Sequence, residues 1–129
     1  MEEKLQFMAS LGNDLRLREI LRTDRRYAVE AYSLVSAALR RLQRRRGRRA
    51  HVSGRDLVRG VVELALERYG NLARLVLEKW GIYRSEDIGE VVFNLVKAGI
   101  LSTSPEDSKE DFRGHPAFTV VFDKAPIEW

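Results

Sequence analysis

Residues 24–42, DRRYAVEAYSLVSAALRRL, hold the clearest helical pattern in this chain of 129 residues. Apolar side chains recur there at spacings of three and four residues, which places them on one face of an α-helix. Asp24 precedes the pattern, where an aspartate side chain can cap the first helical turn. We therefore expect a long helix over residues 24–46. Its apolar positions are Tyr27, Ala31, Leu34, Val35, Ala38, Leu39 and Leu42.

Three shorter helices are expected after the long one, each between a capping residue and a glycine. Polar side chains cap the first helical turn, and glycine ends a helix because it adopts backbone conformations that other residues avoid. Two further amphipathic segments, 2–11 and 14–21, precede the long helix. The start signals are Ser53 with Asp56 three residues on, Asn71 and Ser85, and the stop signals are Gly70, Gly81 and Gly99.

The C-terminal part changes character. Residues 100–103 and 118–123 are short, and the second contains TVVF, whose β-branched and aromatic residues favour strands. With the polar stretch 104–114 between them, they predict a two-stranded β-hairpin with a long tip. The expected fold is therefore α+β, mainly α: a helical bundle that ends in a hairpin.

This order of elements resembles a winged-helix unit, in which the third of three helices precedes a β-wing. The resemblance rests on residues 71–101, NLARLVLEKWGIYRSEDIGEVVFNLVKAGIL, followed by the hairpin. We expect one domain over residues 1–129, a length typical of a single core. Its parts are the N-terminal helices in residues 1–50, a winged-helix-like part in residues 53–123 and a tail in residues 124–129.

The chain also resembles an uncharacterised family of short bacterial proteins with no assigned activity. The resemblance extends from Asp24 to Phe122, and it implies no catalytic or binding residue. A dense run of arginines departs from the ordinary linker expected in such relatives. The matching phrases are DRRYAVEAYSLVSAAL, HVSGRDL, WGI, DIGEVVFNLVKAGIL and DSKEDF.

The composition excludes several classes of site. The chain has no cysteine, so it cannot form a disulfide or a thiolate site, which fits a reducing compartment. The first residues have no basic start and no apolar run, and therefore indicate no signal peptide. No stretch is apolar enough to span a bilayer. We expect a cytoplasmic protein with no membrane partner.

The arginine run is the candidate binding site. The chain has 18 Arg and 5 Lys, and residues 1–52 hold 13 basic and 6 acidic side chains, a net charge of +7. Arginine forks match phosphate oxygens, so such a run can bind nucleic acid in a salt-sensitive way. The alternatives are a solvated helix end or contact with an acidic partner protein. The run comprises Arg40, Arg41, Arg44, Arg45, Arg46, Arg48 and Arg49.

The expected third helix argues against a DNA reader of the winged-helix type. Its outward positions include Glu86, Asp87 and Glu90, and the expected hairpin tip is also rich in carboxylates. Carboxylates in these places would repel phosphates. Nucleic-acid binding is therefore expected, if at all, through residues 40–49.

No catalytic or cofactor motif is present. Asp107, Asp111 and His115 lie four residues apart, but they match no recognised metal-ligand spacing. His51 and Ser53 lack a third partner nearby in sequence that would make a nucleophilic site. The glycines are scattered singly, so no phosphate-binding loop is predicted. We expect no enzyme activity, cofactor, metal or small-molecule ligand.

The expected function is that of a non-enzymatic binding or assembly module that acts through protein–protein contacts. The alternative is nucleic-acid binding through residues 40–49. A homodimer is expected because the long helix, with only short flanking segments, has more apolar surface than one small core would cover. Another protein is the second expected kind of partner.

Overall fold

The structure, a computed structural model, describes residues 14–47, 52–101 and 109–124. In chain order its α-helices are α2 (Leu15–Thr23), α3 (Val29–Arg46), α4 (Gly54–Tyr69), α5 (Ala73–Lys79), α6 (Ser85–Lys97) and α7 (Phe118–Lys124). Two short 3-10 helices are η1 (Gly70–Leu72) and η2 (Lys109–Phe112). Within these ranges there is no strand, so the predicted α+β class is wrong and the described fold is all-α.

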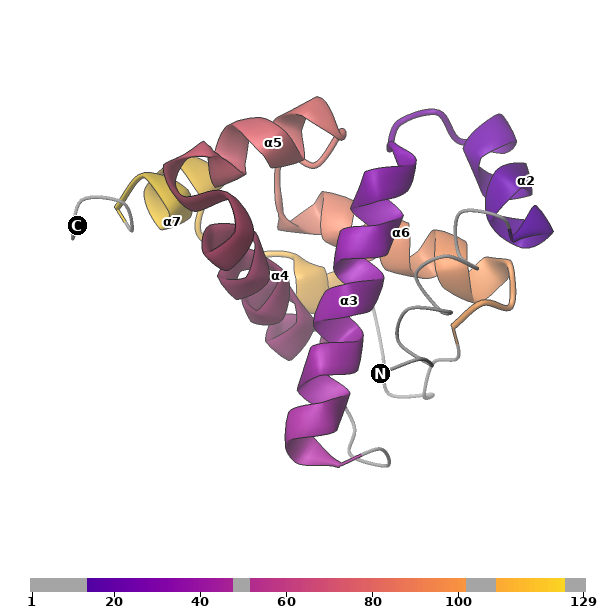
Figure 1. The fold of residues 1–129 in the computed structure, drawn as a ribbon, viewed down its shortest axis with the longest axis horizontal. Coiled ribbons are helices and arrows are strands. Elements are labelled where there is room, and N and C mark those ends of the chain that lie inside the picture. Colours follow the sequence, from indigo (N-terminus) through magenta and orange to yellow (C-terminus); the bar gives the residue numbers. More distant parts are fainter. Residues whose placement is uncertain (1–13, 48–51, 102–108, 125–129) are drawn as a thin grey trace.

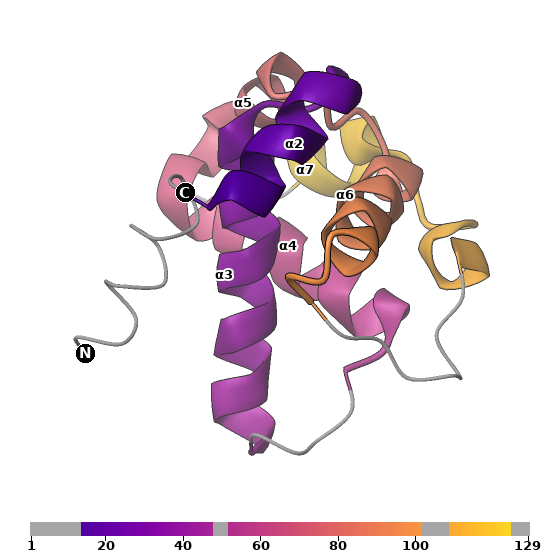
Figure 2. The same cartoon turned by 90° about the vertical axis from the view of Figure 1, so that its right-hand side faces the viewer.

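Helix α3 stands at the centre of the fold (Figure 1). Helices α4 and α6 both pack against it, while α2 contacts α6 and α7 contacts α5. The view turned by 90° shows α6 and α4 on the same broad side of α3 (Figure 2). The core therefore lies where these three helices meet, and Tyr32, Val61 and Ile88 are buried there.

This arrangement covers the apolar face of α3 within the chain. Leu34 and Val35 are almost completely buried, and Leu39 and Leu42 pack against the core. Among the described residues, the large apolar side chains that remain exposed all lie outside α3. The argument for a homodimer through this helix therefore loses its basis, and the oligomeric state stays a prediction.

Helix α4 begins as its sequence predicts. The Ser53 hydroxyl accepts a hydrogen bond from the Asp56 backbone N–H at 3.1 Å, and the Asp56 carboxylate accepts one from the Ser53 N–H at 3.4 Å. This reciprocal capping satisfies two amide groups that the first helical turn leaves unpaired. The predicted start at Ser53 and the predicted stop at Gly70 are both confirmed.

The start of α3 differs from the prediction. Asp24 ends α2 rather than capping α3, which begins at Val29. The Asp24 carboxylate accepts hydrogen bonds from the Arg26 guanidinium at 2.7 Å and from Asn94 Nδ2 of α6 at 3.0 Å. A carboxylate engaged by these donors holds the α2–α3 turn against α6, which sequence spacing alone does not indicate.

Gly81 brings the end of α5 against the same turn. Its φ is +98°, a conformation that favours glycine, and a Cβ there would lie 2.0 Å from the Arg26 carbonyl oxygen. The neighbouring Trp80 carbonyl accepts a hydrogen bond from the Ala28 N–H at 3.0 Å. The chain between α5 and α6 is thus fixed directly on the start of α3.

The predicted C-terminal hairpin and winged-helix part are wrong. Residues 118–123, expected as a strand, belong to α7, and Ile100 and Leu101 form a bend whose N–H groups both bond the Leu95 carbonyl. Residues 102–108, within the expected hairpin, lie outside the described residues. Phe118 and Phe122 are four residues apart, so a helix places both rings on one face, and both are buried. This burial outweighs the strand preference of TVVF.

Phe112 attaches η2 to the bundle. Its ring packs on the backbone of α4 and α6, where a Cβ at Gly89 would lie 2.8 Å from Phe112 Cγ and one at Gly54 3.0 Å from Phe112 Cζ. The Ser85 hydroxyl donates a hydrogen bond to the Phe112 carbonyl at 2.5 Å. The chain that leads into α7 is therefore fixed against α4.

Candidate functional site

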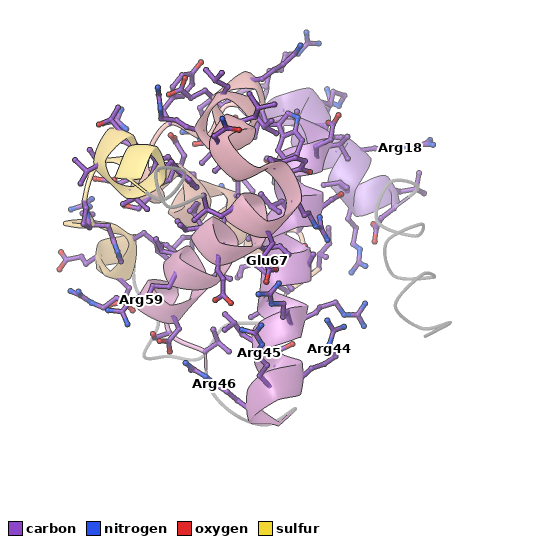
Figure 3. The ribbon with its side chains drawn as sticks, turned by 60° about the vertical axis from the view of Figure 1, so that its left-hand side comes forward. Arg18, Arg44, Arg45, Arg46, Arg59 and Glu67 are labelled. Carbon is purple, nitrogen blue, oxygen red and sulfur yellow. The ribbon has the colours of Figure 1, made fainter. Side chains whose placement is uncertain are left out.

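The second half of α3 and the facing side of α4 form a row of ion pairs. Arg41 Nη2 lies 2.8 Å from Glu63 Oε1, and Arg41 also pairs with Glu67. Arg45 lies 3.3 Å from the same Glu63 oxygen. Figure 3 shows the labelled Arg45 of α3 and Glu67 of α4 on the side where the two helices meet. Carboxylates of the same chain thus already bind these guanidinium groups.

Arg46 makes the next pair along the row, with Asp56 at 2.7 Å. The Arg46 guanidinium, together with the Ser53 hydroxyl and N–H, lowers the pKa of the Asp56 carboxyl to about 2. Hydrogen bonds to the charged form cause such a shift because they stabilise the carboxylate relative to the neutral acid. Asp56 therefore both caps α4 and pairs with α3.

The remaining arginines of the run have different surroundings. Arg44 is exposed and, within the described residues, makes no ion pair or hydrogen bond. In Figure 3 it lies on the side of α3 away from α4. Arg40 is partly buried and has a contact of its own, and Arg48 and Arg49 lie outside the described residues. The structure thus brings Arg41, Arg45 and Arg46 together, but as partners of α4 carboxylates.

The opposite side of α4 carries a groove that sequence analysis missed. Its volume is about 520 Å³, within the range of about 300–1,000 Å³ that is usual for ligand sites. Its walls are α4 on one side and α7 with the segment before it on the other. Its apolar lining comes from Val58, Val62, Leu66, Pro116, Phe118 and Val121.

Two arginines stand among the groove residues. Arg55 and Arg59 are exposed and lie one helical turn apart, and each lines the groove. Within residues 14–47, 52–101 and 109–124, neither guanidinium group makes an ion pair or a hydrogen bond. Arg59 lies on the side of α4 away from α3 (Figure 3). The groove therefore combines an apolar lining with two available guanidinium groups.

A signal for this groove is present in the sequence of α4. Apolar residues at positions 57, 58, 61, 62, 64, 65 and 66 cover more of the helix surface than one packing partner can hide. In the structure Val61 is completely buried, whereas Val62 and Leu66 are only partly buried at the groove.

A second hollow, between α2 and α6, is less suited to a ligand. It is lined by Leu15, Ile20 and Asn94 among others, and two of its charged residues have partners. Arg16 pairs with Asp14 at 2.8 Å, and Glu19 pairs with Arg22 at 2.5 Å. Lys97 is the remaining charged residue of this lining, so the hollow offers one cationic side chain where the groove offers Arg55 and Arg59.

The partly buried polar groups between α3 and α6 hold the fold together. Asn94 Nδ2 donates to the Tyr32 hydroxyl at 3.0 Å, and the Tyr27 hydroxyl donates to Asp87 at 2.7 Å. Burial, followed by the hydrogen bond to Asp87, raises the pKa of Tyr27 above its ordinary value. Tyr27 therefore stays a neutral donor near neutral pH and is no candidate for a general base.

The remaining acidic and histidine side chains form no metal centre in the described part of the chain. No group of three or more His, Asp or Glu residues is arranged there to hold a metal ion. His115 Nε2 lies 2.8 Å from the Asp111 carbonyl oxygen, so this ring nitrogen makes a backbone hydrogen bond. Asp107 lies outside the described residues. No described helix is long and apolar enough to cross a membrane.

Comparisons with known proteins give no further assignment. No family model matches the chain, and no curated protein or solved structure matches it either. The resemblance to a bacterial family is therefore not supported by a family model. In its described residues this is a small all-helical protein, and its function has to be argued from its own side chains.

Proposed function

We propose that this protein is a non-enzymatic module that binds another protein, and that the groove between α4 and α7 is its binding surface. The observation that carries the proposal is the combination of an apolar lining with two exposed arginines that have no partner among the described residues. Protein interfaces commonly place apolar side chains at the centre and arginine beside them. This supports the groove as a place where a peptide segment is recognised.

The experiment that tests this proposal is a selection from a displayed library of random peptides of about 12 residues, a length that covers the groove as a helix. Selected peptides are then titrated into the isotopically labelled protein. We expect the NMR signals of Val62 and Val121 to move most. Signals that move only at α2 and α6 would overturn the assignment of the groove.

A pair of valine substitutions provides the matched control. Val62 lines the groove, whereas Val120 of α7 is exposed outside its lining. We expect Val62→Asp to weaken peptide binding at least about tenfold, because a carboxylate then opposes apolar contacts. Val120→Asp introduces the same charge and should leave the affinity nearly unchanged. Thermal unfolding of both variants shows that each is folded.

Nucleic-acid binding through residues 40–49 remains the alternative, with weaker support. Three of its arginines, Arg41, Arg45 and Arg46, already pair with carboxylates of α4, so phosphates would have to compete with them. The test is titration with short duplex DNA and single-stranded RNA at low and near-physiological salt. Binding that survives near-physiological salt and is lost in R44Q/R48Q/R49Q would reverse the order of the two proposals.

A further inference from the structure

The charges around the groove favour one sign of ligand. Arg55 and Arg59 contribute two positive charges, and Glu63, the one carboxylate that the described residues place in the groove lining, is engaged by Arg41 and Arg45 of α3. Asp56, next to Arg55 in the chain, is engaged by Arg46. His115, also in the lining, bonds a backbone carbonyl through Nε2. The groove therefore presents unbalanced positive charge.

The positive charge lies towards one end of the groove, so the groove has two different ends. Arg55 and Arg59 belong to the first half of α4, and Val62 and Leu66 follow towards its C-terminal end. The N-terminal end of a helix also carries a partial positive charge, which adds to that of the arginines. An occupant would therefore meet a positive end near Arg55 and an apolar end near Leu66.

The dimensions define the occupant further. Arg55 and Leu66 are eleven residues apart on one helix, a distance of about 16 Å at 1.5 Å per residue. A helical segment of about three turns spans this length, with apolar side chains at every third or fourth position. Carboxylates at one end of such a segment could form charge-assisted, two-pronged hydrogen bonds with guanidinium groups.

We propose that the groove receives an acidic amphipathic segment of a partner protein, with its carboxylates at Arg55 and Arg59 and its apolar side chains against Val62 and Leu66. This inference rests on the proposed function, and it adds the chemistry of the partner. It assigns a role in recognition to two arginines that lie outside the arginine run. The distribution of charge along the sequence does not single out these two residues.

The test uses peptides from the library selection as probes, each synthesised with its acidic residues intact and with those residues replaced by lysine. We expect the selected sequences to be acidic and R55E/R59E to weaken their binding at least about tenfold. The lysine peptide should bind R55E/R59E better than it binds the wild-type protein. Such a charge exchange restores affinity only when the two sets of charges face each other.

The control is R44E/R68E, which changes the net charge of the protein by the same amount. Arg44 and Arg68 are exposed, have no ion pair among the described residues and lie outside the groove lining. We expect this variant to change affinity less than about threefold, because exposed charges beyond the Debye length are largely screened. An equal effect of both double variants would overturn the inference, since it would reflect net charge alone.

The outcomes separate the inference from the proposed function. Selected peptides that depend on Val62 but tolerate R55E/R59E would refute the acidic partner and leave the groove as a protein-binding site. If Val62→Asp leaves the affinity of the selected peptides unchanged, both the acidic partner and the groove as a protein-binding site are refuted. If duplex DNA displaces the bound peptide more strongly than additional free peptide does, the ligand of the groove is a polyanion instead. A rise in affinity of about tenfold in I127A/W129A would identify residues 125–129 of the same chain as the occupant.

Discussion

The two sides of α4 use arginine in opposite ways. On the side that faces α3, Arg41, Arg45 and Arg46 pair with three carboxylates of α4. On the side that faces α7, Arg55 and Arg59 of α4 itself have no such partner in the described part of the chain. The first side is occupied within the fold, and the second is open around an apolar groove.

This contrast teaches that the density of charge along a sequence is a poor measure of the charge available for binding. Residues 40–49 hold the densest run of arginines in the chain, yet three of them are neutralised by side chains 10 to 26 residues away. Exposed ion pairs contribute little stability each, but they occupy the guanidinium groups that form them. The arginines without a partner in the described part of the chain include Arg55 and Arg59.

The largest effect is expected from a substitution that removes the anchor of the segment leading into α7, which forms one wall of the groove. We expect Phe112→Ala to lower the free energy of unfolding by about 3–5 kcal/mol, because a buried aromatic ring is replaced by a cavity. Denaturant unfolding measures the change. Tyr83→Ala removes an exposed ring and should change stability by less than about 0.5 kcal/mol. A similar, small loss in both variants would show that Phe112 does not anchor η2.

Two adjacent valines sharpen the comparison within α4 itself. Val61 is completely buried, and Val62 lines the groove and is only partly buried. We expect Val61→Ala to lower the free energy of unfolding by roughly 2–3 kcal/mol and Val62→Ala by less than about 1 kcal/mol. Chemical denaturation of the two variants in parallel provides the measurement. Equal losses would mean that the groove is closed in solution.

The smallest expected effect concerns pH and the ion-paired side. The pKa of Asp56 is about 2 in the folded protein, below its ordinary value near 3.8. The carboxylate therefore adds stability above about pH 4, and this contribution disappears as the pH falls towards 2. Asp56→Asn keeps an oxygen for the helix cap but removes the titrating group. We expect the Tm of this variant to fall less than that of the wild-type protein between pH 5 and 2, with a difference of a few degrees.

Thermal unfolding at a series of pH values gives this comparison. Glu30→Gln is the matched control, because Glu30 is an exposed carboxylate that makes no ion pair with any described residue. Glu30→Gln should change the pH dependence of Tm less than Asp56→Asn does. If Asp56→Asn follows the wild type, the Arg46–Asp56 pair does not contribute in solution.

The helices and most of their ends were predictable because their signals are local. Ser53 with Asp56 and Gly70 after α4 satisfy amide groups or backbone conformations within a few residues of themselves. Asp24 misled the prediction because its donors include Asn94, 70 residues away. The C-terminal helix was missed because TVVF has strand preference, while the burial of Phe118 and Phe122 depends on packing against the rest of the protein.

The candidate site was predictable only in part. The sequence predicted the arginine-rich end of α3 as the candidate binding site, but the acidic residues that pair with three of its arginines come from a different helix. The groove escaped prediction because a pattern of apolar residues does not tell which of them another element will cover. Val61 and Val62 have the same chemistry, and only the position of α3 and α7 makes one a core residue and the other a groove residue.

The sequence by itself determined where most of the helices lie, because periodicity and capping act over one or two turns. It also determined that the chain has no cysteine chemistry. Tertiary structure alone decided that residues 118–124 form α7 and that three arginines of the run pair with α4. It also decided that a groove with two arginines that have no partner among the described residues lies on the other side of α4. The physical reason is that burial and ion pairing join residues distant in the chain, so their outcome depends on how the helices pack.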